Sequence, residues 1–168
     1  MPLTYSGSTP KVITYNGDVV KKVVCNGVTV WAYEITVTYS GACDNKKLGD
    51  KPTYTLTASN ASPVYTDGTY TYTLKIPYCK TTSEEFGTQA YVVPYLKDAR
   101  GNNVKTWSAQ QFDGSYGWDV RYLTLEWTSD IWLGEAESYS LYLDRSGGNY
   151  DFVKFPSGHN ITMTATNA

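Results

Sequence analysis

Apolar and polar residues alternate in short runs along most of the chain, and this pattern predicts a β protein. The clearest run is Thr69–Tyr78, where a large apolar residue takes every second position and threonine or lysine takes most of the positions between. Because successive side chains of a strand point to opposite faces, this run predicts a core strand with one wet face. Similar alternation predicts strands at Thr53–Ala58, Val120–Trp127 and Ile161–Thr166.

The run Gln89–Leu96 is apolar on both faces, which is typical of a strand at the centre of a sheet. Pro94 lies inside this run and has no N–H to donate. We therefore expect either an interrupted ladder or an edge position there. Val104–Trp107 is predicted as a further strand after a hairpin-type turn.

Two segments are predicted as irregular and one as a tight turn. Ser108–Gly117 is read as a loop, and Ser129–Glu137 as an irregular connection with one helical turn at most. Gly147-Gly148 predicts a turn that joins a strand at Tyr139–Leu143 to a return strand at Tyr150–Phe155.

Near the N-terminus, two Asn-Gly pairs stand ten residues apart between runs of valine, threonine and aromatic residues. Asn-Gly readily accepts positive φ at both centres of a type I′ turn, so each pair predicts a hairpin. Asn16-Gly17 would join Val12–Tyr15 to Val19–Cys25, and Asn26-Gly27 would join that strand to one starting at Val28. The sequence therefore predicts a three-stranded meander.

The apolar phase shifts along the last of these strands. Val28 and Val30 fall on one face, whereas Trp31 and Tyr33 fall on the other. Since side chains alternate with a period of two, such a shift predicts a β-bulge or a change of sheet near Trp31. We place the boundary there, with an N-terminal arm and meander at 1–32 and a larger body at 33–168.

The chain holds about ten or eleven short strands separated by turn signals, and no window shows a useful helical period. Many short strands at this spacing predict an all-β fold, an antiparallel β-sandwich. We expect an immunoglobulin-like arrangement, with a jelly roll as the alternative.

The composition favours tyrosine and tryptophan, with 16 Tyr and 5 Trp against 4 Phe. These side chains suit half-exposed strand faces and also surfaces buried against a partner or a sugar. The formal net charge is −2 without a basic stripe, which argues against nucleic acid as a partner. No apolar run approaches the length of a membrane span, and the first residues do not read as a secretory signal. Cys25, Cys43 and Cys79 are expected to be free thiols, with a Cys43–Cys79 bridge as the lesser alternative.

Candidate chemistry is sparse. The one histidine, His159, stands in a Gly/Pro turn and is read as a loop residue rather than a catalytic base. No spacing of His and Cys fits a metal site, and no glycine motif fits a phosphate or a cofactor. A carboxylate pair among Asp113, Asp119 and Glu126 could still serve a glycosidase, because that reaction needs no histidine. We expect no enzymatic activity, metal or cofactor.

Five aromatic residues near the predicted loops form the best candidate for specific recognition. Flat rings exposed at one end of a sandwich can stack on sugars or fill pockets on a protein. The alternative is that some of them pack into the core. The set comprises Trp107, Phe112, Tyr116, Trp118 and Trp132.

The meander carries a resemblance to a known class of proteins. The pattern I-x-Y-N-G-x-x-V-K-K-V-x-x-N-G-x-x-V-W, from Ile13 to Trp31, resembles segments that recur in structural proteins of tailed bacteriophages and prophages, often in tail or other virion-surface components. The resemblance implies attachment surfaces and no catalytic residues. It makes six residues the candidates for partner contact, namely Tyr15, Val19, Val23, Val28, Val30 and Trp31.

A hairpin ribbon is marginally stable alone in water, so it must pack on the body, on a neighbour or on another sheet. The hypothesis is a non-enzymatic virion structural protein, a tail or capsid-surface component assembled in the host cytoplasm, whose partners are other virion proteins and copies of itself. The alternative is a carbohydrate-binding module that recognises a glycan on the host surface.

Overall fold

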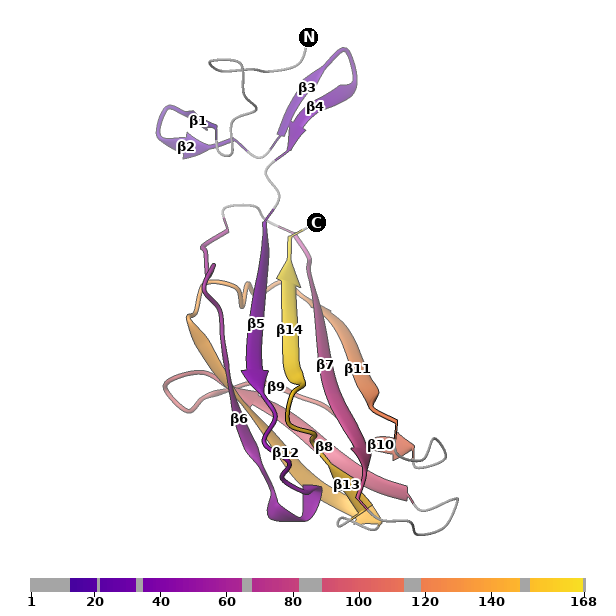
Figure 1. The fold of residues 1–168 in the computed structure, drawn as a ribbon. Coiled ribbons are helices and arrows are strands. Elements are labelled where there is room, and N and C mark those ends of the chain that lie inside the picture. Colours follow the sequence, from indigo (N-terminus) through magenta and orange to yellow (C-terminus); the bar gives the residue numbers. More distant parts are fainter. Residues whose placement is uncertain are drawn as a thin grey trace.

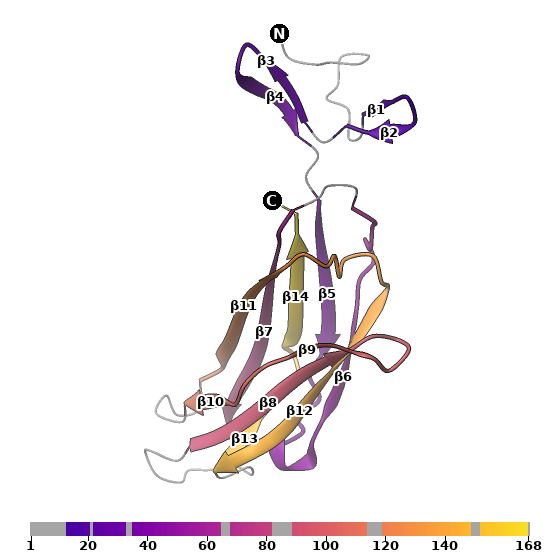
Figure 2. The ribbon, with the colours of Figure 1, turned by 180° about the vertical axis from the view of Figure 1, so that it is seen from behind.

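The computed structural model describes residues 13–20, 22–32, 35–64, 68–81, 89–113, 119–148 and 152–167. The body is a curled antiparallel sheet of ten strands that folds into two packed layers, seen from opposite sides in Figures 1 and 2. The first layer contains β5 (Thr36–Ala42), β14 (Asn160–Thr166), β7 (Tyr70–Lys80) and β11 (Arg121–Ser129), and the second contains β6 (Thr53–Thr57), β12 (Ser138–Gly148), β8 (Gln89–Lys97) and β10 (Gln110–Asp113).

Two short strands and one bridge complete the body. β13 (Val153–Lys154) pairs with β7, and β9 (Asn103–Thr106) pairs with β8. A single pair, Ser40 with Thr57, joins β5 to β6 and so connects the two layers along one edge. A short 3-10 helix, η1 (Leu48–Asp50), stands between β5 and β6.

The strand order identifies the type of sandwich. The eight main strands can be numbered 1 to 8 in chain order, leaving out β9 and β13. Across the first layer (β5, β14, β7, β11) the order is then 1, 8, 3, 6, and across the second (β6, β12, β8, β10) it is 2, 7, 4, 5. This is the arrangement of a jelly roll, a double-sheet fold of eight strands. The prediction of an all-β antiparallel sandwich is confirmed. Of the two arrangements considered from the sequence, the strand order is that of the alternative, the jelly roll, and not the preferred immunoglobulin-like one.

The core lies between the layers, where alternate residues of each strand point inward. In β6, Tyr54 and Leu56 are buried while the threonines between them are exposed. In β14, Ile161, Met163 and Ala165 are fully buried. Each fully buried large apolar side chain contributes about 1.5–3 kcal/mol, so this alternation provides most of the energy that holds the layers together.

Three buried tyrosines fix the loop that joins β11 to β12. Tyr139 Oη donates to the Leu133 carbonyl at 2.6 Å, and the Tyr39 hydroxyl lies 2.9 Å from the same oxygen and 2.5 Å from the Ala136 carbonyl. Tyr72 Oη accepts a hydrogen bond from the Leu133 N–H at 2.9 Å and donates to the Ile131 carbonyl. Specific hydrogen bonds therefore hold this loop, which was predicted as irregular. They fix the backbone of Leu133, whose side chain is buried.

The two Asn-Gly turns form as predicted. Asn16 and Gly17 have φ of 51° and 86°, and Asn26 and Gly27 have φ of 50° and 77°, as a type I′ turn requires. They connect β1 (Thr14–Tyr15) to β2 (Asp18–Val19), and β3 (Lys22–Cys25) to β4 (Val28–Ala32). The expected middle strand is divided into β2 and β3, so the meander consists of two hairpins. Each is a separate two-stranded sheet (Figure 1).

The predicted irregularity near Trp31 is a β-bulge. Val23 pairs with Trp31 and Val24 pairs with Thr29, so Val30 is the extra residue of β4. β4 ends at Ala32 and β5 begins at Thr36. The division into segments 1–32 and 33–168 stays a prediction.

Pro94 lies inside β8, and this strand has partners on both sides. It pairs with Leu143 of β12 on one side, and its carbonyl accepts a hydrogen bond from the Trp107 N–H on the other. On that second side the partner changes from β10, which pairs as far as Val92, to β9, which pairs from Tyr95. Because the N–H and C=O of a strand residue point to the same side, the missing donor falls at this changeover.

The prediction of a turn at Gly147-Gly148 is wrong. Both glycines continue β12 and pair with Tyr91 and Ala90 of β8, after a register shift between Arg145 and Gly147. The next strand that the structure describes, β13, pairs with β7 and not with β12. Glycine is favoured both in a turn and at a bulge within a strand. The sequence alone therefore does not distinguish the predicted turn from the observed bulge.

Candidate interaction surfaces

The hairpins expose apolar side chains among the residues proposed for partner contact. Tyr15 is 72% exposed and Val28 is 64% exposed, while Val23 is partly buried. Val24, which the sequence analysis did not select, is 47% exposed. The side chains of the three remaining candidates, Val19, Val30 and Trp31, lie outside the described residues.

Phe112 does not belong to an exposed cluster, which corrects its selection for glycan contact. It lies in β10 rather than in a loop, and its side chain is fully buried. Its ring packs against Tyr78, with centroids 4.7 Å apart, and against Phe155, with centroids 5.9 Å apart. The four residues of β10 are too few to show alternation, so pairing with β8 decides their conformation.

Trp132 is partly buried and held from two directions. Its indole N–H donates to the Ser62 carbonyl at 2.7 Å, and its ring lies beside Tyr70 with centroids 5.3 Å apart. A Cβ added to Gly134 would stand 2.2 Å from the Trp132 ring, so glycine is needed for this close approach. The ring is therefore part of the wall of the sandwich.

Trp107, which follows β9, is also partly buried. Its ring stands edge-on to Trp127 of β11, and the Lys105 ammonium lies 5.8 Å from the Trp107 ring centroid. Among the described atoms, Trp107 Nε1 is buried without a hydrogen-bond partner. Trp127 in turn stacks on Tyr72, whose ring centroid is 6.5 Å from that of Trp132.

The proposed glycan cluster is therefore divided. Trp107 and Trp132 belong to one run of packed rings, Phe112 belongs to the core, and Tyr116 and Trp118 lie outside the described residues. The three described members offer no common exposed platform for a sugar.

The outer face of β8 and β12 carries an aromatic pair that the sequence analysis missed. Tyr95 and Tyr142 are cross-strand neighbours whose rings stack 4.8 Å apart with an interplanar angle of 4°. The Lys97 ammonium lies 5.1 Å from the Tyr142 centroid, a cation–π contact. Burial, and then Asp144, raise the pKa of Tyr95. The apolar character of both faces of Gln89–Leu96 was the signal, since one face packs in the core and the other carries this pair.

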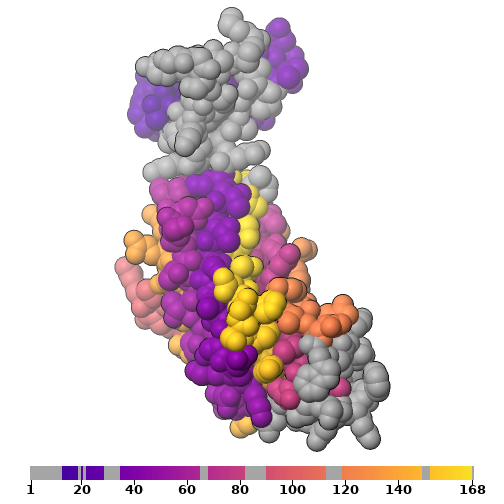
Figure 3. Space-filling model, in the orientation of Figure 1, coloured from indigo at the N-terminus to yellow at the C-terminus, as the bar shows by residue number. Residues whose placement is uncertain are grey.

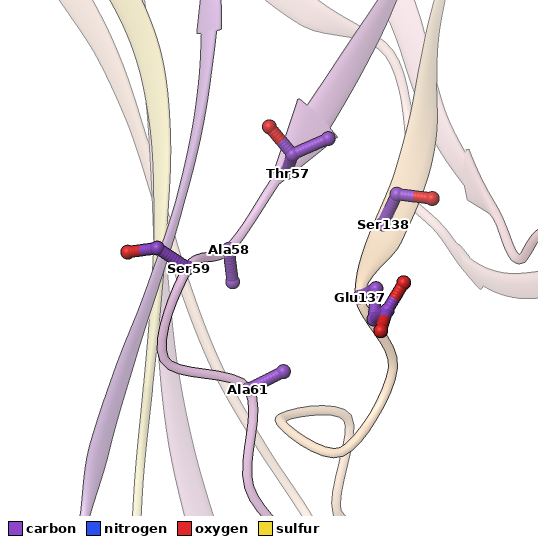
Figure 4. Close-up of a pocket in the computed structure, with 6 residues that line it drawn as sticks. All are labelled: Thr57, Ala58, Ser59, Ala61, Glu137 and Ser138. Carbon is purple, nitrogen blue, oxygen red and sulfur yellow. The ribbon is translucent and has the colours of Figure 1, made fainter.

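Of the candidate acids, the two that the structure describes line neither of its two described hollows. Asp119 is exposed, Glu126 lies on the outer face of β11, and the side chain of Asp113 lies outside the described residues. A hollow of about 320 Å³ lies between the end of β6 and the start of β12, and Glu137 is the one acid among the described residues that line it. Figure 4 shows the Ala61 methyl pointing toward the segment of Glu137, while the hydroxyls of Ser59 and Ser138 point away on opposite sides. The polar groups therefore do not converge on a bound molecule.

The thiols, the possible metal ligands and the helices of the described chain also bear on the predictions. Cys25, Cys43 and Cys79 are free, as predicted, and Cys43 and Cys79 are buried. In the ranges that the structure describes, no three His, Cys, Asp or Glu side chains lie close enough together to hold a metal ion. Within those ranges no helix has the length and hydropathy to cross a membrane.

Comparison with known proteins leaves the family open. No protein-family model and no curated protein matches the sequence. The backbone is similar to a chain in the structure of infectious bursal disease virus, Gt strain, with 12% identity and a TM-score of 0.39. The match covers 99% of this chain and 39% of the viral chain, so this chain spans well under half of that chain's length. Function is therefore inferred from the residues themselves.

Proposed function

We propose that this protein is a non-enzymatic structural component of a tailed-bacteriophage virion, on the tail or the capsid surface. It joins other virion proteins and copies of itself through the two N-terminal hairpins. The observation that carries the proposal is the exposure of Tyr15, Val24 and Val28 on these hairpins. Isolated two-stranded hairpins are marginal in water, and burial of these side chains against a partner would stabilise them.

Charge supports contact between copies of the chain. Residues 1–32 contain three lysines and one aspartate, for a net charge of +2. The whole chain has 14 basic and 16 acidic residues, so residues 33–168 carry 11 basic and 15 acidic residues and a net charge of −4. Opposite charge on the hairpin segment and the body favours the approach of one copy's hairpins to another copy's body.

The fold is compatible with this function without deciding it. Jelly rolls occur in viral capsid proteins and also in lectins, and a fold alone does not define a function. The resemblance of Ile13–Trp31 to segments of phage structural proteins favours the virion. The expected location is therefore the virion, after assembly in the host cytoplasm.

The test compares a hairpin variant with a matched control on the body. In the double variant Tyr15→Ser with Val28→Thr, the hairpins lose the two most exposed of these three apolar side chains but keep residues suited to turns and strands. The control, Ile131→Thr, removes a side chain that is 65% exposed on the loop after β11. Light scattering over a range of protein concentrations, and co-sedimentation with phage particles, measure association.

We expect the wild type and the Ile131→Thr control to associate and the double variant to remain monomeric. Association should weaken as salt is added, because charges of opposite sign take part. A wild type that is monomeric at every concentration and absent from particles would refute the proposal. Equal association of all three proteins would remove the hairpins as the attachment element.

A further inference from the structure

The outer face of the first layer is a regular array of polar side chains, most of them threonine. Figure 3 views the molecule from this side. In β5, β14, β7 and β11, the inward residues alternate with outward ones that align across the strands. The three aligned rows are Thr36, Thr166, Thr71 and Thr128, then Thr38, Thr164, Thr73 and Glu126, then Ser40, Thr162, Lys75 and Thr124.

A hollow of about 330 Å³ opens at the end of this array. The ladder between β14 and β7 ends at the pair Thr162 and Lys75, although β14 begins two residues earlier, at Asn160. Beyond that point β7 takes β13 as its partner. The outward side chains around this change of partner form the wall, and they are Lys75, Tyr122, Thr124, Asn160 and Thr162.

These side chains combine an exposed ring with a mixed set of hydrogen-bonding groups. Tyr122 is 51% exposed, so much of its ring is free for a ligand to cover. Thr124 and Thr162 offer hydroxyls, which both donate and accept, and Asn160 offers two donors and an acceptor. An apolar ring beside such groups matches a sugar, whose ring has an apolar face and a hydroxyl rim.

The positive charge of Lys75 indicates which sugars the hollow would prefer. Among the described residues of its wall Lys75 is the one that carries a charge, and within the same part of the chain it has no ion-pair partner. Glu126, the acid nearest in register, pairs with Thr73 in the next row. An ammonium beside a sugar-sized hollow favours a ligand that carries an acidic group, because a charge-assisted hydrogen bond is stronger than a neutral one.

We propose that this hollow binds one acidic sugar residue of a glycan, such as a uronic or sialic acid. The pyranose ring lies against Tyr122, the carboxylate accepts hydrogen bonds from Lys75, and Asn160 and the two threonines contact ring hydroxyls. The volume is at the lower end of the range for small-molecule sites, which fits a single sugar residue. This site does not depend on the assembly function of the hairpins.

The hollow between β6 and β12 serves as an internal comparison. It has a similar volume, but the described residues of its wall include an acid in place of a cation and no aromatic residue. The two hollows therefore differ in the features that recognise an acidic sugar.

The test uses the full chain on a glycan array that carries uronic-acid, sialic-acid and neutral saccharides. Two variants probe the site, Tyr122→Ala and Lys75→Gln, and Ile131→Ala removes an exposed apolar side chain elsewhere on the body as the control. All three positions are exposed, so the variants should fold, and thermal unfolding checks this. Titration of the wild type with the best acidic saccharide, followed by NMR, locates the contact.

We expect binding to acidic saccharides, reduced roughly tenfold by Tyr122→Ala, which corresponds to about 1.4 kcal/mol. Lys75→Gln should lose the preference for acidic over neutral saccharides, and Ile131→Ala should bind like the wild type. The absence of binding to every acidic saccharide would overturn the proposal. So would binding that Tyr122→Ala retains, a preference for neutral sugars, or shifted NMR signals away from the hollow.

Discussion

The ring of Trp107 stands edge-on to the ring of Trp127, with centroids 5.0 Å apart and planes at 86°. Trp107 follows β9, which pairs with β8 in the second layer, whereas Trp127 belongs to β11, at the end of the first layer. The contact therefore links the two ends of the curled sheet. It closes the sandwich on the side opposite the single bridge between Ser40 and Thr57.

The first prediction concerns this contact. Trp107→Phe keeps an aromatic ring against Trp127 and removes the buried N–H that has no partner among the described atoms. Because an unsatisfied buried donor costs about 1–3 kcal/mol, we expect Trp107→Phe to change the free energy of unfolding by less than roughly 1 kcal/mol. Trp107→Ala loses the ring and should cost about 3 kcal/mol. Urea denaturation measures both, and equal losses would show that the indole N–H is in fact satisfied.

The second prediction follows from the tyrosines that hold the loop after β11. Burial raises the pKa of Tyr72 and of Tyr139 to about 12, and it raises the pKa of Tyr39 further. In the unfolded chain these groups titrate near pH 10. The folded state therefore keeps protons that the unfolded state loses. The resulting stability is fully present below about pH 10 and is lost as the pH rises toward 12.

Each of these tyrosines should lower the free energy of unfolding by up to roughly 1.4 kcal/mol per pH unit in that window. Urea midpoints at a series of pH values give the slope, and tyrosinate absorbance gives the titration. Tyr139→Phe should reduce the slope, because it removes one of these titrating groups. A wild type whose stability is flat up to pH 12 would contradict the raised pKa values.

Local chemistry made part of the fold predictable. Asn16 and Asn26 take positive φ because an Asn-Gly pair accepts the type I′ turn more readily than other residue pairs do. This preference is local and does not depend on the rest of the chain. The alternation in Thr69–Tyr78 predicted both the strand and its buried face, since a period of two leaves one choice of face once a core exists.

Long-range pairing determined what the sequence could not show. Phe112 is buried because β10 pairs with β8, and Trp132 is fixed by a carbonyl 70 residues away, at Ser62. The hollow beside Tyr122 draws its wall from three strands, with Lys75, Tyr122 and Asn160 far apart in sequence. No local pattern indicates that these side chains meet, because their register follows from the order of strands in the sheet.

The third prediction concerns the thiols. Burial is the main cause that raises the pKa of Cys43, to about 11, and of Cys79. Since the thiolate is the reactive form, both should react slowly in the folded protein, whereas the partly exposed Cys25 should react first. Thiol labelling followed by mass spectrometry of peptides gives the order. Labelling of Cys43 before Cys25 under native conditions would show that the region around Cys43 opens easily.

The last prediction compares alanine substitutions at two glycines that differ in the space available for a side chain. A Cβ at Gly134 would stand 2.2 Å from the Trp132 ring, whereas a Cβ at Gly147 would find its nearest neighbour, in the Tyr91 ring, at 3.7 Å. Gly134→Ala must displace a ring whose N–H is bonded to Ser62 and whose face packs beside Tyr70. We expect a loss of about 2–3 kcal/mol and a change in tryptophan fluorescence, because overpacking forces side chains off their rotamers. Gly147→Ala, the control, should change the free energy of unfolding by less than about 1 kcal/mol. If the two variants were equally stable, Trp132 would have room to move, and the wall of the sandwich at this loop would be looser than its hydrogen bonds indicate.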